Sequence, residues 1–110
     1  MSAESTLVFW GIRYEVPRNE ISLLDQNAHP LIKQARQNRL DFFGGNFSEP
    51  DERYLLFIGK KLGMVGGEYS AEILMHEEEL KELVTETNKK LHAGEFQGQP
   101  QLFVQWMPDA

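Results

Sequence analysis

The residues that could carry out acid–base or metal chemistry are few in this sequence, and they are far apart. The three histidines, His29, His76 and His92, fall in three different predicted elements, and there is no cysteine. No two histidines have the HxH or HxxxH spacing of a metal site. A catalyst needs such groups within one pocket, and a chain without cysteine has no thiolate nucleophile. We therefore assign no catalytic and no metal-ligating residue, and we expect no cofactor.

A run of glutamates accounts for the net charge of the chain. Residues 68–86 hold seven glutamates against a single lysine, so this stretch carries a charge of −6, equal to that of the whole chain. It is typical either of a solvated helix face or of an acidic surface that captures a basic protein through Glu78 and Glu82. A nucleic-acid partner is not expected, because phosphate binding needs a cationic surface.

Hydrophobic periodicity predicts six segments in the order β-α-β-β-α-β. Strands are predicted at Thr6–Val16, Tyr54–Leu62, Tyr69–Met75 and Gln101–Met107, and helices at Asn19–Leu40 and Glu77–Ala93. This order is typical of an α+β, split β-α-β two-layer sandwich of ferredoxin-like type, in which two helices cover one face of a four-stranded antiparallel sheet. The 110 residues, 41% of them hydrophobic, fit one domain over 1–110, with 1–5 and 108–110 expected to be flexible tails.

Pro30 divides the first predicted helix. A proline inside a helix removes a backbone donor and clashes with the preceding turn, at a cost of about 3 kcal/mol. We therefore predict two helical pieces, the second of which begins near Pro30 as a first-turn residue.

The longest stretch without periodicity is Asp41–Arg53, which we predict to be a long aromatic loop. Three phenylalanines argue that it is ordered, and a Gly-Gly-Asn sequence allows a tight reversal of the backbone. The loop either binds a ligand or partner, or folds its rings back to plug the open end of the core. The residues that would make the contacts are Phe42, Phe43, Asn46 and Phe47.

Both faces of the predicted sheet are apolar. The face that carries Trp10 and Ile12 should meet the helices, and the opposite face then carries Phe9 and Phe57. If this second face is exposed in the monomer, it is a binding surface or a dimer interface. A loop or a chain terminus that covers it is the alternative. The residues of the second face are Leu7, Phe9, Leu55, Phe57 and Phe103.

Three hypotheses of function follow from these patterns. The leading one is a non-catalytic binding or regulatory module that pairs, as a homodimer or with another protein, through the open sheet face, while the aromatic loop closes over a small-molecule ligand or a protein. The second is an acidic inhibitor or immunity-like protein that neutralises a basic partner through Glu68–Glu86. The third is a small cofactor-free enzyme with the loop as a lid, which requires His29 or a tyrosine in a cleft beside the loop.

Hydropathy favours a soluble, cytoplasmic protein. The sequence contains no apolar run of eighteen residues, so we expect no membrane span. Its first residues lack the basic and apolar regions of a signal peptide. The absence of cysteine is consistent with a cytoplasmic location.

Overall fold

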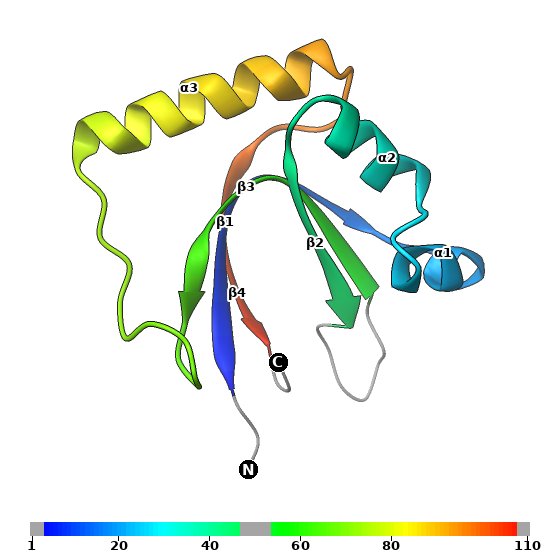
Figure 1. Ribbon diagram of the computed structural model, residues 1–110, viewed down its shortest axis with the longest axis horizontal. Helices are drawn as coiled ribbons and strands as arrows, with labels where there is room; N and C mark the ends of the chain where they lie inside the picture. The colour runs from blue at the N-terminus through cyan, green and yellow to red at the C-terminus, as the bar shows by residue number, and fades with distance from the viewer. Residues whose placement is uncertain (1–3, 47–53, 108–110) are drawn as a thin grey trace.

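A four-stranded antiparallel sheet is the framework of the protein (Figure 1). The computed structural model describes residues 4–46 and 54–107. The strands are β1 (Ser5–Glu15), β2 (Asp41–Asn46), β3 (Tyr54–Val65) and β4 (Gln101–Met107), and they lie in the order β2-β3-β1-β4. β1 and β3 are thus the central strands, and β2 and β4 are the edges. The predicted α+β class and four-stranded antiparallel sheet are confirmed.

Three α-helices and a short 3-10 helix connect the described strands. The 3-10 helix η1 (Arg18–Glu20), α1 (Ile21–Asp25) and α2 (Pro30–Gln37) lie between β1 and β2, and α3 (Glu77–Ala93) lies between β3 and β4. The predicted break in the first helix is confirmed, because Pro30 is the first residue of α2, where no backbone N–H is needed. The predicted bounds of α3 are also confirmed.

The predicted aromatic loop is a strand over its first half, so that prediction is corrected. Asp41–Asn46 forms the edge strand β2 in spite of its two consecutive glycines. Phe42 pairs with Ile58 on one face of the sheet, and Phe43 pairs with Phe57 on the other. Cross-strand packing on both faces outweighs the low intrinsic strand preference of glycine.

The strand predicted at Tyr69–Met75 does not form. Only Ser70 makes an isolated bridge, with Val65, and the long strand β3 takes the place of the predicted hairpin. Ile73 instead packs against the backbone of Gly63, so closely that a Cβ added to this glycine would stand 2.9 Å from the Cδ1 of Ile73. Alternating polarity also fits an extended segment that crosses a sheet face, and this segment runs back along the sheet to the start of α3 (Figure 1).

Each face of the sheet has its own hydrophobic cluster. On the helix side, Ile12 and Ile58 pack with buried side chains from all three α-helices. On the opposite side, Phe9 and Phe57 are both 0% exposed, and their ring centroids lie 5.5 Å apart. The expectation that this second face is open is therefore corrected, because it is the interior of the protein. Its buried members are Leu7, Phe9, Leu55, Phe57, Met64 and Met107.

The second face is closed because the sheet bends into an arch, with the helices outside it (Figure 1). Near the middle of the central strands, Gly11 lies directly opposite Gly59. A Cβ at Gly11 would stand 2.0 Å from the carbonyl oxygen of Ile58, so the two backbones approach too closely for any side chain. Across the arch, Phe103 of β4 meets Phe57 edge to face, with ring centroids 5.4 Å apart. The concave face thus packs against itself.

Candidate functional site

The structure separates the side chains that the aromatic loop was expected to bring together. Phe42 faces the helix side, where a guanidinium of α2 lies 5.2 Å from its ring centroid. Phe43 faces the concave side, with the Nζ of Lys61 at 5.3 Å from its ring centroid. Asn46 is the last residue of β2, and Phe47 lies outside the described residues. Phe42 and Phe43 therefore point to opposite faces and do not share one site.

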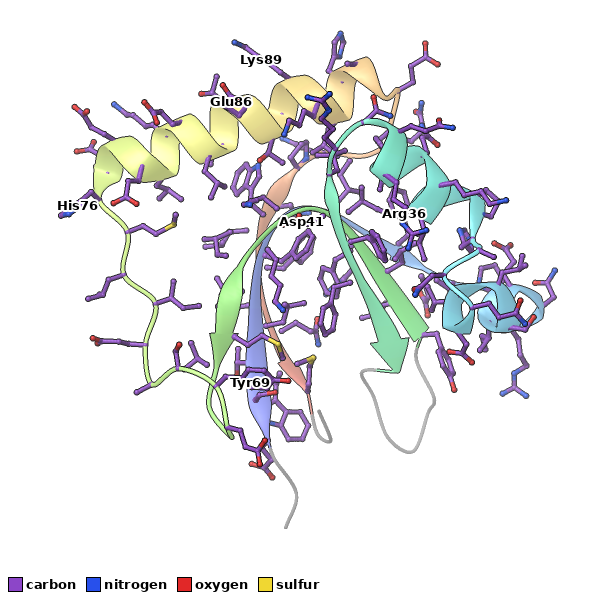
Figure 2. All side chains as sticks on the ribbon, viewed as in Figure 1. Arg36, Asp41, Tyr69, His76, Glu86 and Lys89 are labelled. Atoms are coloured by element: carbon purple, nitrogen blue, oxygen red, sulfur yellow. The ribbon has the colours of Figure 1, made fainter. Side chains whose placement is uncertain are left out.

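The three histidines lie apart, and the buried one has a structural role. His29 is 5% exposed, and its Nδ1 accepts a hydrogen bond from the backbone N–H of Leu31 at 3.1 Å, which caps α2. The proton is therefore assigned to Nε2, which donates to the carboxylate of Glu20 at 2.6 Å. This pair joins η1 to the start of α2. His76 precedes α3 at the far end of the molecule (Figure 2), and His92 is exposed in the last turn of that helix.

A cleft of about 480 Å³ lies where β1 continues into η1. Tyr54 stands in it beside Glu15 and Arg18, so one tyrosine does lie next to the segment predicted as a lid. Tyr14 is used differently, since its hydroxyl donates to the backbone oxygen of Gln97 at 2.9 Å, and burial raises the pKa of this phenol above its usual 10.0. The lining residues of the cleft are Glu15, Val16, Pro17, Arg18, Ile21 and Tyr54.

The acidic residues of α3 face β3 and solvent, with lysines among them. A groove of about 370 Å³ on that flank contains three glutamates and two lysines, so its charge is mixed. Glu82 lines this groove, and Glu78 is exposed one turn earlier. Figure 2 shows Glu86 and Lys89 projecting outward from the same helix. The lining residues are Lys60, Met75, Glu79, Glu82, Leu83, Glu86, Thr87 and Lys90.

Among residues 4–46 and 54–107, no cluster of three or more histidines, aspartates and glutamates could hold a metal ion.

A strip of large apolar side chains is exposed on the edge strand β4. Leu102 is 51% exposed, Val104 66% and Trp106 51%. They alternate along the strand and therefore share one face, which is the helix side of the sheet, because their partners on β1 lie on that side. We call these three residues the β4 strip. Their cross-strand partners on β1 are Trp10, Val8 and Thr6.

None of the described helices covers the β4 strip. α3 packs against β1 and β3, whereas α1 and α2 lie at the other end of the sheet, beside β2 (Figure 1). The indole Nε1 of Trp10 donates to the side-chain oxygen of Asn88 at 2.9 Å, which fixes α3 over β1. The helix layer thus stops one strand short of β4.

The outer backbone edge of β4 has no partner among the described residues. β4 pairs with β1 on one side only, and its seven residues, Gln-Leu-Phe-Val-Gln-Trp-Met, include no charge and no proline. Natural edge strands usually carry charges, prolines or bulges that prevent pairing with other chains. The opposite edge has such a charge, because β2 begins with Asp41, whose carboxylate accepts a hydrogen bond from the backbone N–H of Lys61 at 3.0 Å.

Comparison with protein-family models, with curated proteins and with solved structures found no match. Within the described part of the chain, no helix is both long enough and apolar enough to cross a membrane.

Sequence reasoning missed the β4 strip for a specific reason. The alternation along β1 predicts that Trp10 faces the helices, and the ferredoxin-like order predicts a helix layer over all four strands. The signal that identifies β4 was nevertheless present, since Gln101–Met107 is the one predicted strand without a charged residue. A predicted strand that is apolar on one face and uncharged throughout is a candidate for pairing with another chain.

Proposed function

We propose that the protein is a non-catalytic binding module that recruits another polypeptide through the β4 strip and the outer edge of β4. The observation that carries this proposal is the coincidence of two features on one strand. Three large apolar side chains are half to two-thirds exposed, and the backbone beside them lacks a pairing partner among the described residues.

The physical basis is strand addition. An extended segment that pairs with β4 gains backbone hydrogen bonds along the edge, and its own side chains cover the strip. Half of a large side chain amounts to about 100 Å², so the strip offers roughly 300 Å² of apolar surface. At about 25 cal/mol per Å², its burial contributes on the order of 7 kcal/mol before the entropic cost of association is subtracted.

We further propose that the domain has the ferredoxin-like, split β-α-β topology. The strand order β2-β3-β1-β4 supports this, because β3 separates β1 from β2 and β1 separates β3 from β4, so the two β-α-β units interlock. This fold serves many unrelated functions, so the proposed binding role depends on the surface of β4 and not on the fold.

Site-specific photo-crosslinking in cells tests the binding role. A photoreactive phenylalanine analogue at Val104 should form a covalent adduct with another polypeptide, because that side chain lies at the centre of the strip. The matched control places the same analogue at Thr85, which is exposed on the outer side of α3. Mass spectrometry of the adduct identifies the polypeptide and the residue attached. Adducts that are absent at Val104, or equally abundant at Thr85, would contradict the proposal.

A second candidate function is the capture of a basic protein by α3. Glu78 and Glu82 lie one turn apart, both are exposed, and neither has an ion-pair partner among the described residues, whereas Lys81 pairs with Glu77 at 3.9 Å. If this function holds, reversing both charges (Glu78→Lys with Glu82→Lys) should weaken binding of a basic partner by about tenfold or more at low salt. The difference should shrink as salt is added. Replacing Asp25 and Glu95, which are exposed and lie outside Glu68–Glu86, by lysine is the charge-matched control. Equal effects of the two pairs would exclude a specific α3 surface.

A further inference from the structure

We infer that the polypeptide that pairs with β4 is a second copy of the same chain, joined antiparallel about a two-fold axis at Val104. This inference rests on the proposed function and names its partner. The result is one continuous eight-stranded antiparallel sheet, with the helices of both copies on the same side.

The side-chain pattern of β4 complements itself in this register. In an antiparallel pair centred on Val104, that residue faces its own copy, and Leu102 faces Trp106 of the second copy. Side chains that lie directly opposite in such a pair project to the same face, so all three apolar residues of the strip meet apolar residues. Shifting the centre by one residue leaves Trp106 or Leu102 without an opposite member of the strip.

The charge distribution permits two identical surfaces to meet. β4 carries no charge. On α3, helical periodicity places Glu77, Lys81 and Asn88 on one flank, and Asn88 bonds to Trp10 of β1, the strand next to β4. Glu77 and Lys81 of this flank form an ion pair at 3.9 Å. The acidic residues Glu82 and Glu86 line the groove on the opposite flank, beside β3. The dimer therefore brings together neutral surfaces and keeps the acidic rows at the outside.

The small area of the surface favours a weak dimer. The strip offers roughly 300 Å² of side-chain surface per copy, compared with about 800 Å² per partner in a standard stable interface. The paired backbone edge adds to this, but the total remains at the small end. The dimer should therefore dissociate in the micromolar range and show a mass that depends on concentration.

The test begins with light scattering of the unaltered chain over a concentration series. The mass should rise from that of a 12.7 kDa monomer towards twice that value. Val104→Lys should shift the midpoint of this transition by at least about tenfold, because it places two like charges opposite each other on the axis. Thr85→Lys, which adds the same charge on α3, should leave the midpoint unchanged. A monomer at every concentration, or equal effects of the two variants, overturns the inference.

Single cysteines then test the register, since the chain has none of its own. Opposite residues of an antiparallel pair have Cα atoms about 4.5–5.5 Å apart, which suits a disulfide. Val104→Cys should therefore couple to itself under mild oxidation at least about tenfold faster than Thr85→Cys. Leu102→Cys should couple to Trp106→Cys and not to itself. Self-coupling of Leu102→Cys that is as fast as the mixed reaction overturns the register.

The two proposals fail in different ways. If the chain is monomeric in vitro and the analogue at Val104 is attached in cells to a different protein, the second-copy inference is wrong and the binding role stands. If the chain is monomeric and nothing is attached at Val104, both are wrong.

Discussion

The Gly11→Ala variant loses most of the stability of the domain or fails to fold. A Cβ at this position would stand 2.0 Å from the carbonyl oxygen of Ile58 and 2.9 Å from the Cα of Gly59, and both are backbone atoms. No rotamer change can relieve such a contact, so β1 and β3 must separate where the sheet bends. We expect the free energy of unfolding to fall by at least about 4 kcal/mol, in a domain whose total is typically about 5–15 kcal/mol. Urea denaturation followed by circular dichroism measures this.

Gly67→Ala is the matched control for the glycine variant. Gly67 has a positive φ of 58°, but it is exposed and lies outside the sheet. The same substitution there should cost about 1–2 kcal/mol, the cost of a left-handed backbone alone. If the free energy of unfolding falls by the same amount in both variants, the close approach of the central strands is not the reason that position 11 requires glycine.

The second large loss of stability is expected when Phe57 is truncated. Its ring is 0% exposed and contacts the rings of Phe9 and Phe103 across the concave face. Phe57→Ala should lower the free energy of unfolding by about 3–5 kcal/mol, because it removes a buried ring and leaves a cavity that the arch cannot close. Denaturation in urea, with the slope m compared between variants, separates this loss from a change in the unfolded state.

Leu74→Ala provides the reference for the phenylalanine variant. Leu74 is 81% exposed in the segment before α3, so its truncation should change stability by no more than about 0.5 kcal/mol. A loss of less than about 1 kcal/mol for Phe57→Ala would mean that its ring is solvated, as an open second face requires.

Sequence patterns correctly predicted the helix ends that depend only on neighbouring residues. Pro30 starts α2 because of its own ring, and α3 has the predicted bounds because its glutamates and Gly94 mark the two ends. The alternation along β1 correctly placed Trp10 and Phe9 on opposite faces, since successive side chains of any strand alternate.

The exposure of each face of the sheet depends on contacts between residues that are far apart in the sequence. Hydrophobic periodicity does not predict such contacts. Phe9 is buried because Gly11 and Gly59 allow two strands to bend together, and neither glycine alone indicates that pairing. β2 was missed because two glycines interrupt its pattern and its partners lie on β3. The β4 strip was missed because the width of the helix layer depends on where α3 packs, which the hydrogen bond from Trp10 to Asn88 fixes in space.

Hydrogen–deuterium exchange of the β4 amides, measured residue by residue, tests the central claim most directly. Alternate amides of Gln101–Met107 point away from β1, and in an isolated chain they have no strand to pair with among the described residues. We predict that these outward amides become protected as protein concentration rises through the micromolar range, and that Val104→Lys moves this protection to at least about tenfold higher concentration. Fast exchange of the outward amides at every concentration, alongside slow exchange of those bonded to β1, would contradict the claim that another copy of the chain covers this edge.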